Sequence, residues 1–246
     1  MCGRYGFTPD KDFVDDFEIE NRGETKWHPS YNSAPTSMNP IVTMNSPKTL
    51  HLALWGFLPA WAKAQNMGYS TSNAISEEIE DKPMYKHAFK EGRCLVPVSF
   101  YFEFAHMKDD PKHKVAYLFK LKKEKVFALA GLYNIWHDPK EDKDIFTYTI
   151  LTTKANKTGA KVHSRMPVIV AKEDWDTWAD NKHYDSVTMK KLMQPFPDSE
   201  MEHWPVSQEL NNGRNNYPEL IEKVPEIPVI PSKPAWEEKL EKKSSK

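Results

Sequence analysis

Cysteine is scarce in this chain of 246 residues, which contains only Cys2 and Cys94. A secreted fold stabilised by disulfides needs more cysteines, so the count favours a reducing cytoplasm. Two cysteines do not form a zinc site alone, and none of the nine histidines stands at ligand spacing from either of them. We therefore expect no metal ion and no cofactor.

Long apolar runs are also absent, and no stretch approaches the length of a membrane span. The first ten residues, MCGRYGFTPD, contain no apolar signal core, so the sequence does not indicate export. With 39% hydrophobic and 28% charged residues, the composition is that of an ordinary globular protein. We expect a cytoplasmic monomer with no membrane partner.

The chain has no excess of charge of one sign, since its formal net charge is −1. Bulk electrostatics therefore does not indicate nucleic-acid binding, and any contact with DNA must come from a local patch. Arginine is the rarer cation, with five residues, so its placement is informative. Three of them, Arg4, Arg93 and Arg165, fall inside the sequence motifs described below.

Strand patterns dominate the middle of the chain, where apolar residues alternate with polar ones or form short β-branched and aromatic runs. The predicted strands cover 50–54, 94–104, 115–119, 125–136 and 146–153. Pro97 indicates an edge or a bend within its run. Helices are predicted over 83–92, 172–180 and 185–194, the last capped by Asp185 or Ser186.

Strands and helices mix without a βαβ rhythm, so we predict an α+β fold in a single compact domain. The domain is expected to cover residues 1–223. From Val224 onward prolines recur and charge then dominates. This composition predicts an extended or disordered C-terminal tail, rich in proline and lysine, over 224–246.

Cys2 directly follows the initiator methionine, which is commonly trimmed before a small residue. Trimming would leave an α-amine and a thiol on one carbon skeleton, with ordinary pKa values of about 7.7–8.0 and about 8.5. Such a 1,2-aminothiol reacts specifically with aldehydes: the amine forms a Schiff base and the thiol then closes a five-membered thiazolidine ring. The structural alternative is a cysteine in a frayed end.

Seven segments stand out together along the chain. They are MCGRYGF at 1–7, YNSAPT at 31–36, WGFLPAWAK at 55–63, SNAISEE at 72–78, RCLVPVSFYFEF at 93–104, VHSRMPVIV at 162–170 and PVSQELNN at 205–212. In this order they resemble the SRAP family, named for SOS response-associated peptidase, whose members are abasic-site processing proteins. The resemblance implies a β-barrel-like core of mixed or antiparallel strands flanked by short helices, and a groove for single-stranded DNA.

The resemblance also implies the residues that react. Cys2 would be the nucleophile that crosslinks to the aldehyde of an abasic deoxyribose, and Asn73, Glu103 and His163 match further catalytic positions. A carboxyl group with a raised pKa and a histidine near neutrality can divide the acid–base work. Asn73 can hold the terminus or a sugar oxygen. The structural alternatives are a solvated carboxylate for Glu103 and a structural histidine for His163.

For DNA binding we expect Arg4 and Arg165 to contact phosphates, and Trp61 and Phe104 to stack on bases. Trp55 is a weaker stacking candidate, because a core position suits its strand pattern better.

Two residues depart from the family pattern. Ile75 stands where the family has an arginine, which Lys82 or Lys86 would have to replace. Phe104 stands where it has a tryptophan.

Three other functions remain open at this point. Glutamine amidotransferases also mature to an N-terminal cysteine, although their glutamine-binding motifs are missing here. A thiol peptidase would use Cys2, Glu103 and His163, minimally to remove Met1. A non-catalytic single-strand binding module would form no covalent product. The favoured reading is a covalent sensor of abasic sites in single-stranded DNA, acting in the DNA damage (SOS) response.

Overall fold

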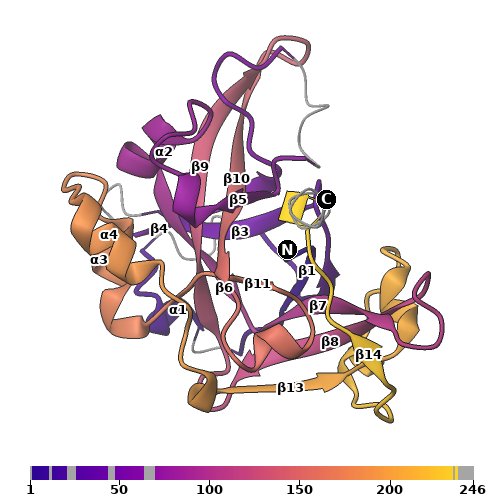
Figure 1. Ribbon diagram of the computed structural model, residues 1–246. Helices are drawn as coiled ribbons and strands as arrows, with labels where there is room; N and C mark the ends of the chain where they lie inside the picture. Colours follow the sequence, from indigo (N-terminus) through magenta and orange to yellow (C-terminus); the bar gives the residue numbers. More distant parts are fainter. Residues whose placement is uncertain are drawn as a thin grey trace.

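The computed structural model describes residues 2–10, 13–20, 26–43, 48–63, 70–234 and 236–237. Two β-sheets pack against each other and short helices lie around them (Figure 1). Within these ranges no helix is long and apolar enough to cross a membrane.

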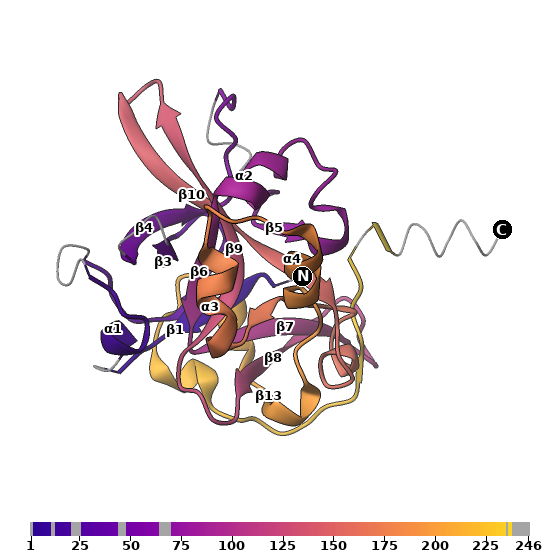
Figure 2. The same ribbon diagram turned by 90° about the vertical axis from the view of Figure 1, so that its left-hand side faces the viewer.

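Five strands of the larger sheet close into a barrel. In barrel order they are β10 (Lys143–Lys154), β4 (Thr49–Trp55), β3 (Met38–Thr43), β6 (Arg93–Val98) and β9 (Phe127–Asp138), which pairs back with β10. The β4–β10 pair is parallel and the other four pairs are antiparallel. The predicted α+β fold with a mixed, barrel-like core is therefore confirmed. The long β9–β10 hairpin extends beyond the barrel (Figure 2).

Three short strands enlarge the barrel sheet. Strand β5 (Asn73–Ile75) and strand β11 (Arg165–Pro167) pair with β10, and β12 (Ile169–Val170) pairs with β9.

The second sheet has the order β13 (Met201–Pro205), β8 (Lys114–Leu121), β7 (Phe100–Met107), β1 (Arg4–Phe7) and β2 (Ser30–Ser33). Strand β1 is an inner strand, because it pairs with β2 along one edge and with β7 along the other. A further strand, β14 (Val229–Ile230), also pairs with β7.

The apolar run predicted as one strand over 94–104 forms two strands in different sheets. Pro97 lies opposite Ala128 of β9, in a part of β6 that β3 does not reach, so its missing N–H interrupts no ladder there. Ser99 separates β6 from β7 and its backbone N–H donates to the Gly6 carbonyl oxygen at 2.8 Å. The bend that Pro97 indicates carries the chain from the barrel into the second sheet.

The helices are shorter than predicted. They are α1 (Phe13–Asp16), α2 (Lys86–Glu91), α3 (Trp175–Ala179) and α4 (Ser186–Leu192), with 3-10 turns at Ser76–Glu78, Gly159–Lys161, Lys172–Asp174, Asp198–Glu200, Gln208–Asn211 and Pro218–Ile221. Asp185 caps α4 by accepting from Thr188 N–H at 2.8 Å. Gly92 follows α2, where a Cβ would lie 2.5 Å from the Tyr133 carbonyl oxygen, so the close approach requires glycine.

A buried pair of tyrosines joins the two sheets. The hydroxyl groups of Tyr5 on β1 and Tyr148 on β10 lie 2.7 Å apart in a hydrogen bond, and the Tyr5 ring contacts Trp55 with centroids 4.9 Å apart. Tyr5 is only three residues from Cys2. This bond therefore helps to fix the start of the chain against the barrel.

We expect Tyr5→Phe to lower the free energy of unfolding by about 0.5–1.5 kcal/mol, because the Tyr148 hydroxyl loses one of its two buried partners, Tyr5 and Asn39. Denaturant unfolding monitored by circular dichroism measures the change. Tyr217→Phe is the control, since Tyr217 bonds Glu209 at the surface. Equal losses in the two variants would contradict the prediction.

The described part of the C-terminal segment is extended and runs across the domain. Val224 N–H donates to the Pro205 carbonyl oxygen at 3.0 Å, β14 joins the second sheet, and Ser232 forms a parallel bridge with His163. Residues 238–246, the lysine-rich end of the predicted tail, lie outside the described residues.

Candidate functional site

Cys2 is completely buried, at 0% exposure, just before β1 begins. Arg4 lies opposite Phe102 of β7, so the two residues before Arg4 run alongside Glu103 on the same strand. The Cys2 Sγ lies 3.7 Å from the Arg4 carbonyl oxygen, to which it donates. Burial, and less strongly the Glu103 charge, raise the pKa of the Cys2 thiol well above its usual range. The thiol is therefore neutral in this environment.

Asn73 holds the backbone of Cys2. Its side-chain N–H donates to the Cys2 carbonyl oxygen at 2.8 Å and to Ser72 Oγ at 3.3 Å. Asn73 is the first residue of β5, which is fixed by its parallel pairing with β10. Among the described residues no donor reaches Asn73 Oδ1, which is a buried acceptor.

Glu103 is 2% exposed in the middle of β7. Its neighbours two positions along the strand, Tyr101 and Ala105, belong to the main hydrophobic core. Burial raises the pKa of the Glu103 carboxyl to about 6, although the charges of the amino terminus and Lys114 oppose the shift. A carboxyl group with this pKa exchanges protons near neutral pH.

His163 is 5% exposed in the loop before β11. Its Nδ1 accepts from the Arg165 backbone N–H at 2.9 Å, so the proton of the neutral ring lies on Nε2. Burial lowers the pKa of His163 to about 3, and nearby positive charges contribute. The expectation of a histidine titrating near neutrality is therefore not met. His163 is a neutral N–H donor at physiological pH.

These four residues come together in space from four separate segments. The charge of Glu103 acts on Cys2, the charge of Lys114 acts on both Glu103 and His163, and Asn73 bonds to Cys2 directly. The site thus lies between the start of β1, the middle of β7, the first residue of β5 and the loop before β11.

Three of the sequence motifs meet around Arg4. Asn32 of β2 donates to the carbonyl oxygens of Leu210, Asn212 and Asn215, which draws the loop after β13 onto β2. A Cβ at Gly213 in that loop would lie 3.3 Å from the Arg4 guanidinium. Arg4 is half-buried, against this loop and close to Cys2.

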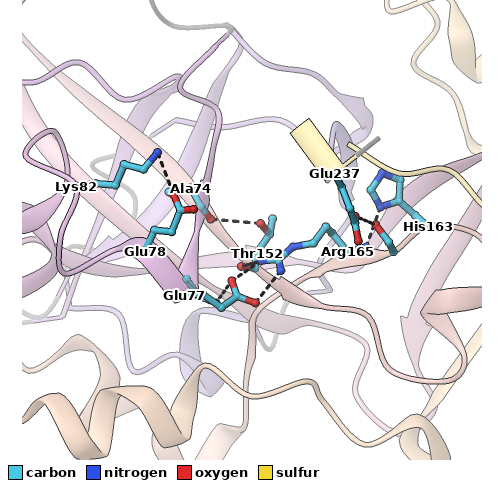
Figure 3. A network of polar contacts seen from close by, with 10 residues as sticks. Ala74, Glu77, Glu78, Lys82, Thr152, His163, Arg165 and Glu237 are labelled. Atoms are coloured by element: carbon cyan, nitrogen blue, oxygen red, sulfur yellow. Dashed lines mark hydrogen bonds and ion pairs between the residues drawn. The ribbon is translucent and has the colours of Figure 1, made fainter. Parts of the chain in front are cut away.

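Arg165 is 3% exposed and its guanidinium is bonded within the protein (Figure 3). Nη1 and Nη2 donate to the two oxygens of Glu77 at 2.7 Å each, and Nη2 also donates to the Thr152 carbonyl oxygen at 2.6 Å. The same residue supports His163 through its backbone N–H. The backbone of Arg165 thus helps to hold His163 in place. A phosphate could reach the Arg165 guanidinium only by displacing Glu77.

The profile of the SOS response associated peptidase (SRAP) family matches residues 1–213. The chain belongs to the SRAP family. An abasic site processing protein, YoqW, of Bacillus subtilis (strain 168) is 37% identical over 225 residues, covering 90% of this chain and 99% of the relative. The abasic site processing protein HMCES of Xenopus tropicalis is 28% identical over 224 residues, covering 80% of this chain and 66% of the relative.

The fold of this SRAP protein also resembles solved structures. The crystal structure of a protein from Bacteroides thetaiotaomicron superposes with a TM-score of 0.79 at 21% identity, covering 91% of this chain and all of the other. At this identity the likeness concerns the fold.

The aromatic candidates of the SRAP chain lie in three different environments. Trp61 is 65% exposed, on a loop that two bonds hold to the β9–β10 hairpin: Asn134 Nδ2 donates to Leu58 O at 2.8 Å and Trp136 Nε1 to Ala62 O at 2.7 Å. Trp55 is buried and donates to Ser72 O at 2.8 Å, which makes it a core residue. Phe104 is half-buried in a second apolar cluster.

At the position where the family has arginine, Ile75 is half-buried. The two lysines considered as substitutes for that arginine lie at the surface. Lys82 pairs with Glu78 at 3.0 Å, and Lys86 is exposed on α2.

Tyr101 lies beside these residues, although the sequence analysis singled out only Glu103 and Phe104 on its strand. It is completely buried, two residues before Glu103 on the same face of β7. Its hydroxyl has no hydrogen-bond partner among the described residues. Burial, with the charges of Glu103 and Cys2, raises the pKa of Tyr101 well above its usual range. The period-two spacing from Glu103 was the available signal.

We expect Glu77→Ala to lower the free energy of unfolding by about 1.5–3 kcal/mol, because the buried guanidinium of Arg165 loses its carboxylate. Glu78→Ala is the matched control, since Glu78 pairs with Lys82 in solvent and should lose at most about 0.5 kcal/mol. Denaturant titration of both variants measures the difference. Equal stabilities would show that the Arg165–Glu77 pair does not contribute to the free energy of unfolding.

Proposed function

We propose that this protein processes abasic sites in DNA and does so through a covalent thiazolidine bond formed by Cys2 after removal of Met1. The observation that carries the proposal is the placement of Cys2 beside a buried carboxyl group with a pKa of about 6 and a buried neutral imidazole. The names of the SRAP relatives, abasic site processing proteins, support the choice of substrate. Met1 itself lies outside the described residues.

The reaction balances with loss of one water molecule. The free amine of Cys2 adds to the C1′ aldehyde of the open-chain deoxyribose and gives a carbinolamine. Protonation of its hydroxyl releases water and leaves a protonated Schiff base. The Cys2 sulfur then adds to the same carbon as its proton departs, which closes the five-membered thiazolidine ring.

The neighbouring residues suit these steps. Protonated Glu103 supplies the proton that releases water, and its carboxylate can then accept the thiol proton. The Nε2–H of His163 can hydrogen-bond a sugar oxygen without carrying charge. Asn73 fixes the Cys2 backbone by its bond to the carbonyl oxygen, which orients the amine and thiol together.

We propose single-stranded DNA as the bound form. The exposed indole of Trp61 offers a face for base stacking, worth roughly 1–3 kcal/mol per base, whereas a duplex hides those faces. Arg4 is the proposed phosphate ligand, because it is partly exposed and only two residues from Cys2, whereas a phosphate would have to displace Glu77 to reach Arg165.

We expect purified protein lacking Met1 to form a heat-stable adduct with an abasic single strand, detected on a denaturing gel. Cys2→Ala should lose it, apart from a Schiff base trapped by borohydride, and protein that retains Met1 should not react. An abasic duplex should react more slowly, and Trp61→Ala should narrow that difference. Absence of any wild-type adduct, with Met1 removal verified by mass spectrometry, would refute the proposal.

We also expect a defined pH profile for adduct formation at saturating DNA. The amine reacts unprotonated, so its reactive fraction rises with pH up to about 8. The acid form of Glu103 is lost as pH rises through about 6. The rate of adduct formation follows these two fractions multiplied together. The rate therefore rises up to about pH 6, is level from about 6 to 8, and falls at higher pH.

Glu103→Gln removes the acid, so the rate should be lower, rise up to about pH 8 and then stay level. A Glu103→Gln profile that falls above that pH as the wild-type profile does would show that Glu103 is not the acid.

A further inference from the structure

A proline-rich strap, defined as the described residues 224–234 and 236–237, joins the strand of Glu103 to the loop of His163. Prolines recur at every third position from Pro225 to Pro234. This period matches the three-residue turn of a polyproline II helix, in which the prolines fix φ in advance. The strap therefore loses less conformational entropy when it docks than an ordinary extended segment does.

The strap leaves β7 beside the start of the chain. Ile230 pairs with His106 and Arg4 pairs with Phe102, and β8 occupies the other edge of β7 over this stretch. The amino-terminal residues and the strap therefore approach each other along one edge of β7, on either side of Glu103.

From there the strap crosses to the loop before β11. Ser232 N–H donates to the Val162 carbonyl oxygen at 2.8 Å, and Ser164 N–H donates to the Ser232 carbonyl oxygen at 2.9 Å. These two bonds are made by Val162 and Ser164, the residues directly before and after His163. A further bond runs from Ser164 Oγ to Glu237 Oε2 at 2.5 Å, where Glu237 reaches the loop that carries His163 (Figure 3).

The side chain of Ser232 is unusual for so deep a position. Ser232 is 3% exposed, yet within the described residues its Oγ has no hydrogen-bond partner. A buried hydroxyl without a partner is unfavourable, and such groups in native proteins call for an explanation. Because His163 and Ser232 are direct partners in a parallel bridge, their side chains project to the same side.

We propose that Ser232 is a further residue of the reactive site, where its hydroxyl hydrogen-bonds an oxygen of the abasic deoxyribose beside His163. This inference rests on the proposed function. The substrate supplies the partner that the hydroxyl lacks, and the backbone of the strap holds His163 in the position from which it contacts the same sugar. Ser232 binds the sugar and transfers no proton of its own.

The test measures the rate of adduct formation at saturating abasic single strand together with thermal stability. Ser232→Ala should slow the reaction about tenfold, equivalent to about 1.4 kcal/mol. Its stability should stay equal or rise, because no hydrogen bond within the protein is lost. Ser232→Thr keeps a hydroxyl and should restore most of the rate. Ser199→Ala, at an exposed serine in the turn before β13, should react as wild type does.

The outcomes separate this inference from the proposed function. If wild-type protein forms the adduct and Ser232→Ala reacts at the same rate, Ser232 is not a site residue. A Ser232→Ala variant that loses rate and stability together, with no rescue by threonine, would mean that Ser232 only supports the fold. If wild-type protein forms no adduct, the proposed function fails and this inference fails with it.

Discussion

The site depends on the way in which β1 is held. Chain ends usually fray, but β1 pairs along both edges, and its Tyr5 is bonded to Tyr148 of the barrel. Asn73 adds a bond to the Cys2 carbonyl oxygen. An amino-terminal residue held on these sides has a fixed position relative to Glu103, so the covalent chemistry proposed for Cys2 starts from an arranged geometry rather than from a mobile end.

Burial shifts the pKa values of three site residues so that each favours its uncharged form. It raises the pKa of the Cys2 thiol, raises that of the Glu103 carboxyl and lowers that of the His163 ring. Each shift favours the uncharged form, as desolvation requires. An uncharged site suits imine chemistry, which needs a neutral amine and an available acid. It does not suit a thiol peptidase that relies on a thiolate paired with a protonated histidine.

Local motifs predicted the residues that meet at the site, because Cys2, Asn73, Glu103 and His163 each lie in a short, recognisable segment. They did not predict relations between distant residues. The guanidinium of Arg165 pairs with Glu77, which lies 88 positions away in the chain. The low pKa of His163 follows from its packing. Ser232 lies in a proline-rich stretch whose composition predicts extension but not the loop on which it docks.

Contacts between distant residues also determine which arginines can bind DNA. Arg93 is completely buried and donates to backbone carbonyl oxygens, among them Trp178 O at 2.7 Å and Phe89 O at 2.8 Å. With Arg165 also bonded internally, two of the three motif arginines support the fold. Arg4 is the one arginine proposed to contact a phosphate, and the net charge of the chain is −1, so long-range electrostatic attraction to DNA is expected to be weak. A protein that binds DNA weakly by charge can still retain it through a covalent bond. The proposed crosslink at Cys2 would therefore keep the protein on the abasic site.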